Sequence, residues 1–138
     1  WKTLARDEYN GLKLGIIISI GYAPEKIPLK QEGIRTAIRL RTKKPAQIMT
    51  ANGEPTEPEK MPEWFNRGIN AVLACPAAIN KLPVVFDLTD GVVSASMPNQ
   101  RHLVQDYDLG ISKLHFELAA DLKGTWELGQ PGRFIVSE

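Results

Sequence analysis

Apolar residues recur at helical spacing most clearly over residues 63–74. The stripe that this spacing predicts consists of Phe65, Ile69, Val72 and Leu73. Polar residues take the other side, namely Asn66, Arg67 and Asn70. Pro62 suits the first turn of such a helix, and Pro76 stops it, because proline lacks the N–H that a helix interior needs. The pattern predicts an amphipathic helix from Glu63 to Ala74.

A period of two replaces the helical period in the segment that follows. Apolar and polar positions alternate over residues 84–89, and a second strand-forming run covers residues 92–97. Asp90-Gly91 lies between the two runs, and this pair is a strong hairpin signal because glycine accepts positive φ without steric cost. We therefore predict a β-hairpin over residues 83–97 with its turn at Asp90-Gly91.

A second helix is predicted over residues 106–120, and it is apolar on more than one side. Its predicted stripe consists of Tyr107, Ile111, Leu114 and Leu118. Leu109 and Phe116 add apolar surface elsewhere, so we expect this helix to be central. Asp106 or Asp108 is the expected N-cap.

The remaining segments carry weaker patterns. Residues 13–22 suggest a buried strand, because an apolar, β-branched run is closed by glycine. Residues 30–45 have partly helical spacing, but Gly33 and dense charge leave helix and loop both open. Residues 52–62, with three prolines, form a connector, and residues 133–137 form a last short strand. The sum predicts an α+β fold with strands paired partly antiparallel.

Length and composition limit the class of protein. The 138 residues, 43% of them hydrophobic, fall within the size range of a single domain with a real core. No apolar run approaches the roughly 20 residues of a membrane-spanning helix, so no membrane partner is expected. The net charge of +1 gives no argument for nucleic acid as a partner. A single cysteine, Cys75, excludes an internal disulfide and fits a reducing compartment such as the cytoplasm.

Charge is nevertheless segregated along the chain. Residues 30–44 carry six basic side chains against Glu32, whereas residues 54–63 carry four glutamates against Lys60. The basic run either attracts a phosphate-bearing ligand or forms a solvated face. It contains no interleaved aromatic residue, which argues against stacking on nucleic-acid bases.

Few residues suggest catalysis by the protein itself. Cys75 follows a predicted helix, where the negative end of the dipole disfavours a thiolate, so we expect it to pack rather than react. His102 and His115 lack further ligands at zinc spacing, so no metal site is expected, and His115 is expected to be a core histidine. Asp108 and Glu117 fall on different sides of their helix and do not form an acid–base pair. The catalytic residues therefore stay unknown.

Two blocks of sequence carry a family resemblance. Residues 74–83 read Ala-Cys-Pro-Ala-Ala-Ile-Asn-Lys-Leu-Pro and resemble the Pro-Ser-Ala-x-Asn-x-Gln-Pro loop that contacts the flavin in FMN-dependent nitroreductases. Residues 107–117 are similar to the Asp-x-Gly-Ile…His-Phe-Glu helix of one nitroreductase branch, whose chains look like tandem, single-chain versions of the usual dimer. Segments 18–22, 43–45 and 62–65 follow the order of that branch, so the resemblance spans roughly residues 14–126.

The resemblance implies a nitroreductase-like α+β fold, with a mixed or antiparallel sheet flanked by helices. It implies a flavoprotein that passes a hydride from NAD(P)H through FMN to a nitroaromatic or quinone-type acceptor. Carried over residue by residue, the flavin would be lined by Pro76, Ala77, Ala78 and Asn80. The Asn80 amide offers both a donor and an acceptor for the polar edge of the flavin ring.

Three positions depart from the family's loop. Ala77 replaces the usual Ser, Leu82 replaces Gln, and Val84 replaces the aromatic residue after the second proline. A second interpretation therefore stays open, in which the loop is a helix-to-strand corner and Asn80 merely closes its own turn. On that interpretation the chain is a non-catalytic flavin-binding or structural member of the same fold.

The resemblance also bears on domain organisation and partners. Residues 1–138 are similar to the C-terminal part of a single nitroreductase-like domain, and no segment of the chain matches the Arg-Arg-Ser type motif that holds the FMN phosphate in the family. We therefore expect the N-terminal half of the domain to be a separate piece. The expected polypeptide partner is that half or a second copy of the chain, as in a homo-oligomer.

Overall fold

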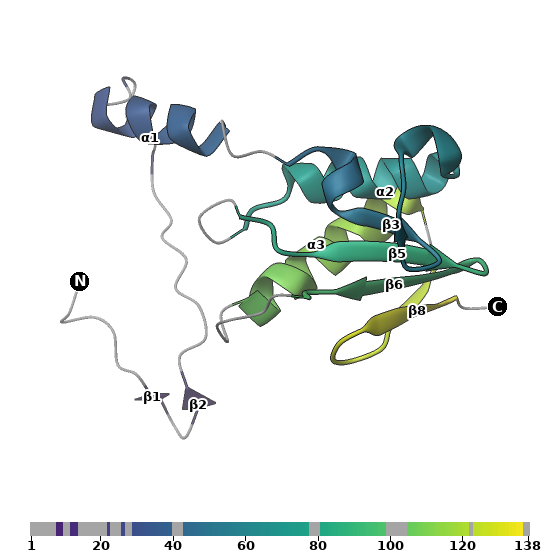
Figure 1. Cartoon of the computed structure of the whole chain (residues 1–138). Helices are drawn as coiled ribbons and strands as arrows, with labels where there is room; N and C mark the ends of the chain where they lie inside the picture. Colours follow the sequence, from purple (N-terminus) through teal and green to yellow (C-terminus); the bar gives the residue numbers. More distant parts are fainter. Residues whose placement is uncertain are drawn as a thin grey trace.

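A computed structural model describes residues 8–9, 12–13, 22, 26, 29–39, 43–77, 81–98, 105–121 and 123–136. Its main body is a six-stranded mixed sheet with helices packed on it (Figure 1), which is compatible with the predicted α+β class. The helices are α1 (Leu29–Arg39), α2 (Glu63–Ala74) and α3 (Gln105–Ala120), with 3₁₀ turns η1 (Pro45–Gln47) and η2 (Pro58–Lys60). The strands are β1 (Glu8–Tyr9), β2 (Leu12–Lys13), β3 (Met49–Ala51), β4 (Glu54–Pro55), β5 (Val85–Thr89), β6 (Val92–Ser96), β7 (Gly124–Trp126) and β8 (Gly132–Val136).

The strands of the sheet follow the order β4-β3-β5-β6-β8-β7. β3 and β5 run parallel, and the other neighbouring pairs are antiparallel. A parallel pair needs a crossover connection, which α2 supplies between β3 and β5. β1 and β2 form a separate antiparallel pair. Most of the predicted strand over residues 13–22 lies outside the described residues; of its ends, Lys13 belongs to β2, and Tyr22 is exposed and in no strand.

β5 and β6 form the predicted hairpin. Thr89 pairs with Val92, so Asp90 and Gly91 are the two loop residues. Their φ angles of 49° and 80° are both positive, as a type I′ turn requires. The turn prediction is therefore confirmed. Phe86, which precedes the turn, is fully buried on the face of the sheet that the helices cover.

α2 begins and ends at the residues that the apolar spacing predicts. Three residues of its predicted stripe are buried, namely Phe65, Ile69 and Val72. The segment over residues 30–45, for which helix and loop were both open, contains a helix, since residues 29–39 form α1. The described side chains of α1 are exposed, and Figure 1 shows this helix set apart from the sheet. α2 therefore belongs to the core, whereas α1 does not.

The face that α3 buries is not the predicted one. Tyr107, Leu114 and Leu118 of the predicted stripe are 45%, 54% and 72% exposed. The buried residues of α3 are Asp108, Leu109, Ser112, Lys113, Phe116 and Ala120. The cause lies in α2, because Gly68 has no side chain and leaves room for the Phe116 ring. The N-cap prediction was also wrong, since α3 begins at Gln105 and both Asp106 and Asp108 lie inside its first turn.

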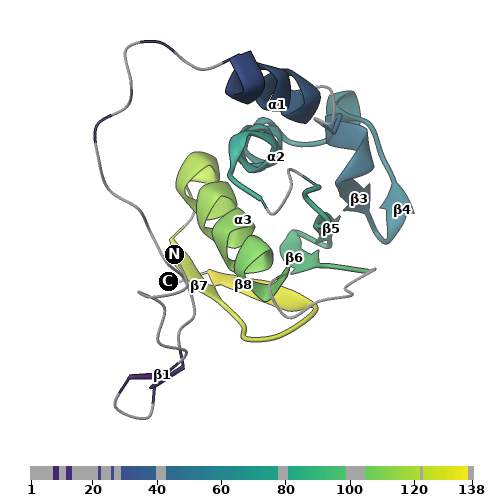
Figure 2. The same ribbon diagram turned by 90° about the vertical axis from the view of Figure 1, so that its left-hand side faces the viewer.

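Phe116 is the centre of an aromatic cluster between the helices and the sheet. Its ring is stacked on Phe86 at a centroid distance of 4.7 Å. The rings of Phe65 and Trp126 meet it edge-on at 5.3 Å and 6.2 Å. Figure 2 shows α2 and α3 together on one face of the sheet. The cluster thus joins both helices to β5 and β7.

The other face of the sheet carries a polar cluster around Asp87. Its carboxylate accepts hydrogen bonds from the Thr50 hydroxyl at 2.6 Å, from the Gly53 backbone N–H at 2.8 Å and from the Thr89 hydroxyl. Partial burial raises the pKa of Asp87, but the three hydrogen bonds outweigh it and hold the pKa below its ordinary value. The cluster ties β3 and the turn that follows it to β5.

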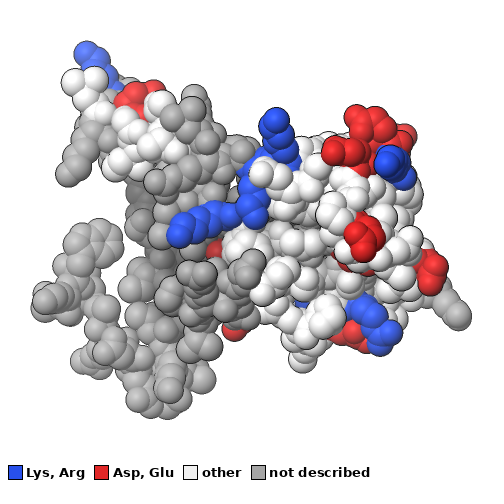
Figure 3. Space-filling view, in the orientation of Figure 1, with Lys and Arg blue, Asp and Glu red and all other residues white. Residues whose placement is uncertain are grey.

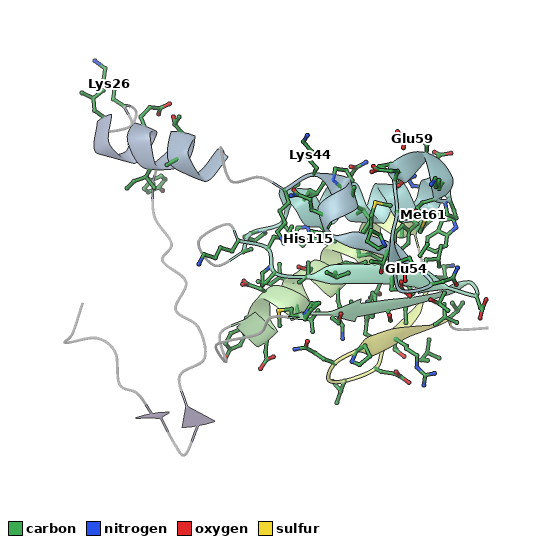
Figure 4. The ribbon with its side chains drawn as sticks, in the orientation of Figure 1. Lys26, Lys44, Glu54, Glu59, Met61 and His115 are labelled. Carbon is green, nitrogen blue, oxygen red and sulfur yellow. The ribbon has the colours of Figure 1, made fainter. Side chains whose placement is uncertain are left out.

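Charged side chains separate over the surface, as the sequence pattern indicates. Figure 3 shows acidic side chains gathered at the end of the body far from α1. Figure 4, in the same orientation, labels Glu54 and Glu59 toward that end and Lys44 nearer to α1. Burial lowers the pKa of the neighbouring Lys43. The phosphate-binding and solvated-face interpretations of residues 30–44 both stay predictions.

Candidate functional site

The loop after α2 contains the four residues predicted to line a flavin. Cys75 caps α2 with extended backbone, because Pro76 cannot continue the helical ladder. Pro76 is exposed, and Ala77 is half-buried and packs against the core. Ala78 and Asn80 lie outside the described residues. The described part of the loop therefore presents an apolar surface at a helix end, which fits one side of a flat ring.

Two of the three departures from the family's loop are core residues. Leu82 and Val84 are 5% and 0% exposed. Leu82 also has a φ of 40°, in the left-handed region that leucine rarely adopts. Such strain costs about 1–3 kcal/mol and concentrates at ligand-binding loops. The apolar side chains at these two positions are thus explained by packing, whereas Ala77 has partial access to solvent.

Cys75 is a packing residue, as predicted. It is 4% exposed, and its sulfur lies 3.6 Å from the hydroxyl oxygen of Ser112 on α3. Burial raises the pKa of the Cys75 thiol, and the Ser112 hydroxyl opposes that shift. Burial therefore disfavours the thiolate and shields the sulfur, which fits packing rather than reaction.

A second candidate site is an open cavity of about 590 Å³ between α3 and the chain that follows β7. α3 contributes Leu109, Gly110, Lys113 and Glu117 to its lining. Trp126 and Leu128 line it from the other side. Two of its lining residues, Leu109 and Lys113, are buried. Exposed side chains such as Leu128 form its rim. It combines apolar walls with a few charged groups, as small-molecule sites do.

Lys113 is the buried cation of this cavity, with 8% of its surface exposed. Its Nζ donates to the carbonyl oxygens of Glu127 at 3.2 Å and Gly129 at 3.4 Å. The same atom lies 5.3 Å from the centroid of the Trp126 ring. Burial lowers the pKa of Lys113, and the Glu127 carboxylate opposes that shift. Glycine suits position 132, because a Cβ there would overlap Nζ and lie 2.7 Å from the backbone oxygen of Glu127.

An ion pair fixes the loop that forms the second wall. Arg133 donates from Nη2 at 2.8 Å and from Nε at 3.0 Å to the two carboxylate oxygens of Glu127. These hydrogen bonds lower the pKa of Glu127. The bidentate pair joins the two ends of the loop over residues 127–133, so the carbonyl groups that hold Lys113 are themselves held in place.

The sequence patterns missed this cavity. In the sequence, Lys113 was only one residue of the helix motif over residues 107–117. Trp126 was only the last residue of the segment that resembles the family. One signal was present, since Lys113 lies four residues after Leu109 and three before Phe116, on the side of α3 that turns out to be buried. A lysine on a buried face needs acceptors, and the loop after β7 supplies them.

The other candidate residues give no further site. His115 is half-buried, and His102 lies outside the described residues. Asp108 is buried, whereas Glu117 lines the cavity. Among the described residues, no three His, Cys, Asp or Glu side chains are placed to hold a metal ion. No helix within the described ranges is both long and apolar enough to cross a bilayer.

Comparison with protein families gives one finding. A family model described as "Putative TM nitroreductase" matches residues 2–120. The match includes the loop after α2 and the helix α3, which are the two blocks that carry the resemblance. Comparisons with the curated proteins and with the solved structures found no significant match.

Proposed function

We propose that this chain, which belongs to the family described as "Putative TM nitroreductase", is part of an FMN-dependent oxidoreductase. Membership of the family indicates an oxidoreductase role. Nitroreductases generally use a flavin, which when bound supplies the two-electron chemistry between NAD(P)H and a nitroaromatic or quinone acceptor. The observation that carries the proposal is the family match over residues 2–120, which contains the whole of the candidate flavin loop.

The loop after α2 is the proposed flavin contact. The exposed ring of Pro76 and the half-buried Ala77 would form an apolar wall against the flavin. The backbone of Ala78 and the side-chain amide of Asn80 would bind its polar edge. These residues bind and orient, and none of them transfers a proton. The left-handed backbone at Leu82 supports a loop shaped for a ligand.

Replacing Asn80 by alanine is expected to weaken FMN binding by about 1–2 kcal/mol, because a polar group of the ligand loses its hydrogen-bond partner. The loss corresponds to roughly a 5- to 30-fold higher dissociation constant. Quenching of flavin fluorescence on titration measures it. Asn70→Ala is the matched control, since Asn70 is exposed on α2 and lies outside the loop. Equal affinity of the Asn80 variant and the parent protein would contradict the proposal.

The alternative function is a non-catalytic member of the fold. The packing of Leu82 and Val84 favours it, because the chain has no polar or aromatic ligand contact at these positions. A protein that is colourless, and that retains no flavin absorbance after FMN is added and the unbound FMN is removed, would favour a structural member without flavin. Ala77→Ser is the informative restoring variant, whereas Leu82→Gln would place an amide in the core.

We also propose a polypeptide partner for the outward face of α3, in a cytoplasmic complex. Tyr107, Leu114 and Leu118 are all strongly exposed and lie along one side of the helix. Exposed apolar side chains that gather on one face mark an interaction surface. The proposed partner is the N-terminal half of the domain or a second copy of the chain. If the partner is a second copy, sedimentation of the purified chain should show a dimer or larger species, and a stable, folded monomer would contradict this form of the proposal.

A further inference from the structure

We propose that the cavity between α3 and the loop after β7 binds a flat aromatic molecule that carries a neutral carboxamide group. The site is built by Leu109, Lys113, Glu117 and Trp126. It shares no residue with the loop over residues 76–80, so the inference does not depend on flavin binding.

The size and walls of the cavity suit a small aromatic ligand. Its volume of about 590 Å³ falls inside the usual range of ligand sites, roughly 300–1,000 Å³. Leu109 is 5% exposed and forms part of the inner wall, and Trp126 faces it across the cavity from the end of β7. Leu114 and Leu128, 54% and 100% exposed, stand at the rim. A flat ring entering between these side chains would remove apolar surface from water.

Lys113 offers a hydrogen-bond donor at the inner end of the cavity. An ammonium group has three N–H bonds, and two of the donors of Lys113 are used by the carbonyls of Glu127 and Gly129. No described residue accepts the third as a hydrogen bond, and the Trp126 ring is the remaining neighbour. The ion pair between Glu127 and Arg133 holds the loop that carries the two carbonyl groups, and these fix the position of Nζ. An acceptor oxygen of the ligand would complete its coordination.

Glu117 offers an acceptor on the same wall. It follows Lys113 by four residues, which places both side chains on one face of α3. It is half-buried, lines the cavity and forms no salt bridge with any described residue. The two neighbours therefore offer one donor and one acceptor to a single ligand group.

These two charges select a neutral ligand group. A ligand carboxylate would be attracted by Lys113 but repelled by Glu117. A ligand ammonium would be attracted by Glu117 but repelled by Lys113. The Glu127 carboxylate also lines the cavity, but Arg133 balances its charge. Lys113 is the more deeply buried charge and opposes a cation at the inner end. A carboxamide supplies an oxygen for Lys113 and an N–H for Glu117, and it needs no counter-charge.

The test compares three probes that share one ring system. 2-Naphthamide, 2-naphthoate and 2-naphthylmethylammonium are titrated into the full chain, with binding followed by ligand-observed NMR and calorimetry. We expect the amide to bind at least about tenfold more tightly than either charged probe. Equal binding of all three, tighter binding of a charged probe, or binding of none would overturn the proposal.

Variants locate the probe in the cavity. Gly110 lines it, and an added side chain there meets no heavy atom within 4 Å of its Cβ, so Gly110→Leu should fill the space without disturbing the fold. We expect this variant to lose amide binding, and retained binding would overturn the proposal. Asn70→Ala, at an exposed position of α2 outside the cavity lining, is the control and should bind as the parent does.

Glu117→Gln tests the charge selection directly. A glutamine keeps an acceptor oxygen but removes the negative charge, so we expect amide binding to persist and naphthoate binding to tighten about tenfold. Circular dichroism and melting temperature show whether the variant keeps the fold. Unchanged naphthoate affinity in a folded variant would contradict the role of Glu117.

Discussion

Phe116→Ala is expected to lower the free energy of unfolding by about 3–5 kcal/mol, the range for removing a buried aromatic side chain. The Phe116 ring is fully buried, and it contacts rings from α2, β5 and β7. Alanine would leave a cavity between three elements, and the stacked Phe86 ring is held by its own strand and cannot fill it. The loss is large because α3 gives up its ring contacts with α2 and with the sheet at the same time.

Urea denaturation followed by circular dichroism measures this loss. Leu29→Ala is the matched control, because Leu29 is a helical leucine on α1 that is 91% exposed. The control should change the free energy of unfolding by no more than about 0.5 kcal/mol. A loss below about 1 kcal/mol for Phe116→Ala would mean that the aromatic cluster does not hold the two helices to the sheet.

Gly68→Ala is expected to destabilise the protein by about 1–3 kcal/mol, although alanine favours helices more than glycine does. An added Cβ at Gly68 would lie 2.5 Å from two ring carbons of Phe116. The ring has little room to move, because it is stacked on Phe86 and meets Phe65 and Trp126 edge-on. Either α2 or the ring has to shift, and the aromatic packing loosens.

The comparison that isolates this overlap is Gly110→Ala. Gly110 is also inside a helix, but a Cβ there has open space around it, so alanine should stabilise by up to about 1 kcal/mol. In a Phe116→Leu background, Gly68→Ala should cost much less, because the smaller side chain leaves room. If the two substitutions change the free energy of unfolding additively, the side chains at positions 68 and 116 do not contact each other.

Local elements could be predicted from the sequence where one pattern dominated. α2 begins and ends at the predicted residues, because prolines bound it on both sides and its apolar stripe is unambiguous. The hairpin turn at Asp90-Gly91 followed from the φ preferences of two adjacent residues. Both features depend on neighbours in the sequence, so neither required knowledge of the fold.

The candidate sites were predictable only in part. The loop over residues 76–80 was found by resemblance, and the family match over residues 2–120 supports the family but not the role of each residue. The burial of Leu82 and Val84 could not be foreseen, because an apolar residue in a loop serves equally as core or as ligand wall. The cavity beside Lys113 needs the loop after β7, which lies fourteen or more residues away along the chain.

The sequence by itself determined where α2, α3 and the hairpin form, the lack of a disulfide, and the family to which the chain belongs. Only the tertiary structure decided which face of α3 is buried. The apolar stripe of Tyr107, Leu114 and Leu118 has the larger side chains, yet it is exposed. Burial depends on the shape of the partner surface, and the space over Gly68 admits the Phe116 ring from the opposite face. That choice also brings Lys113 to the loop after β7, and it thereby creates the cavity.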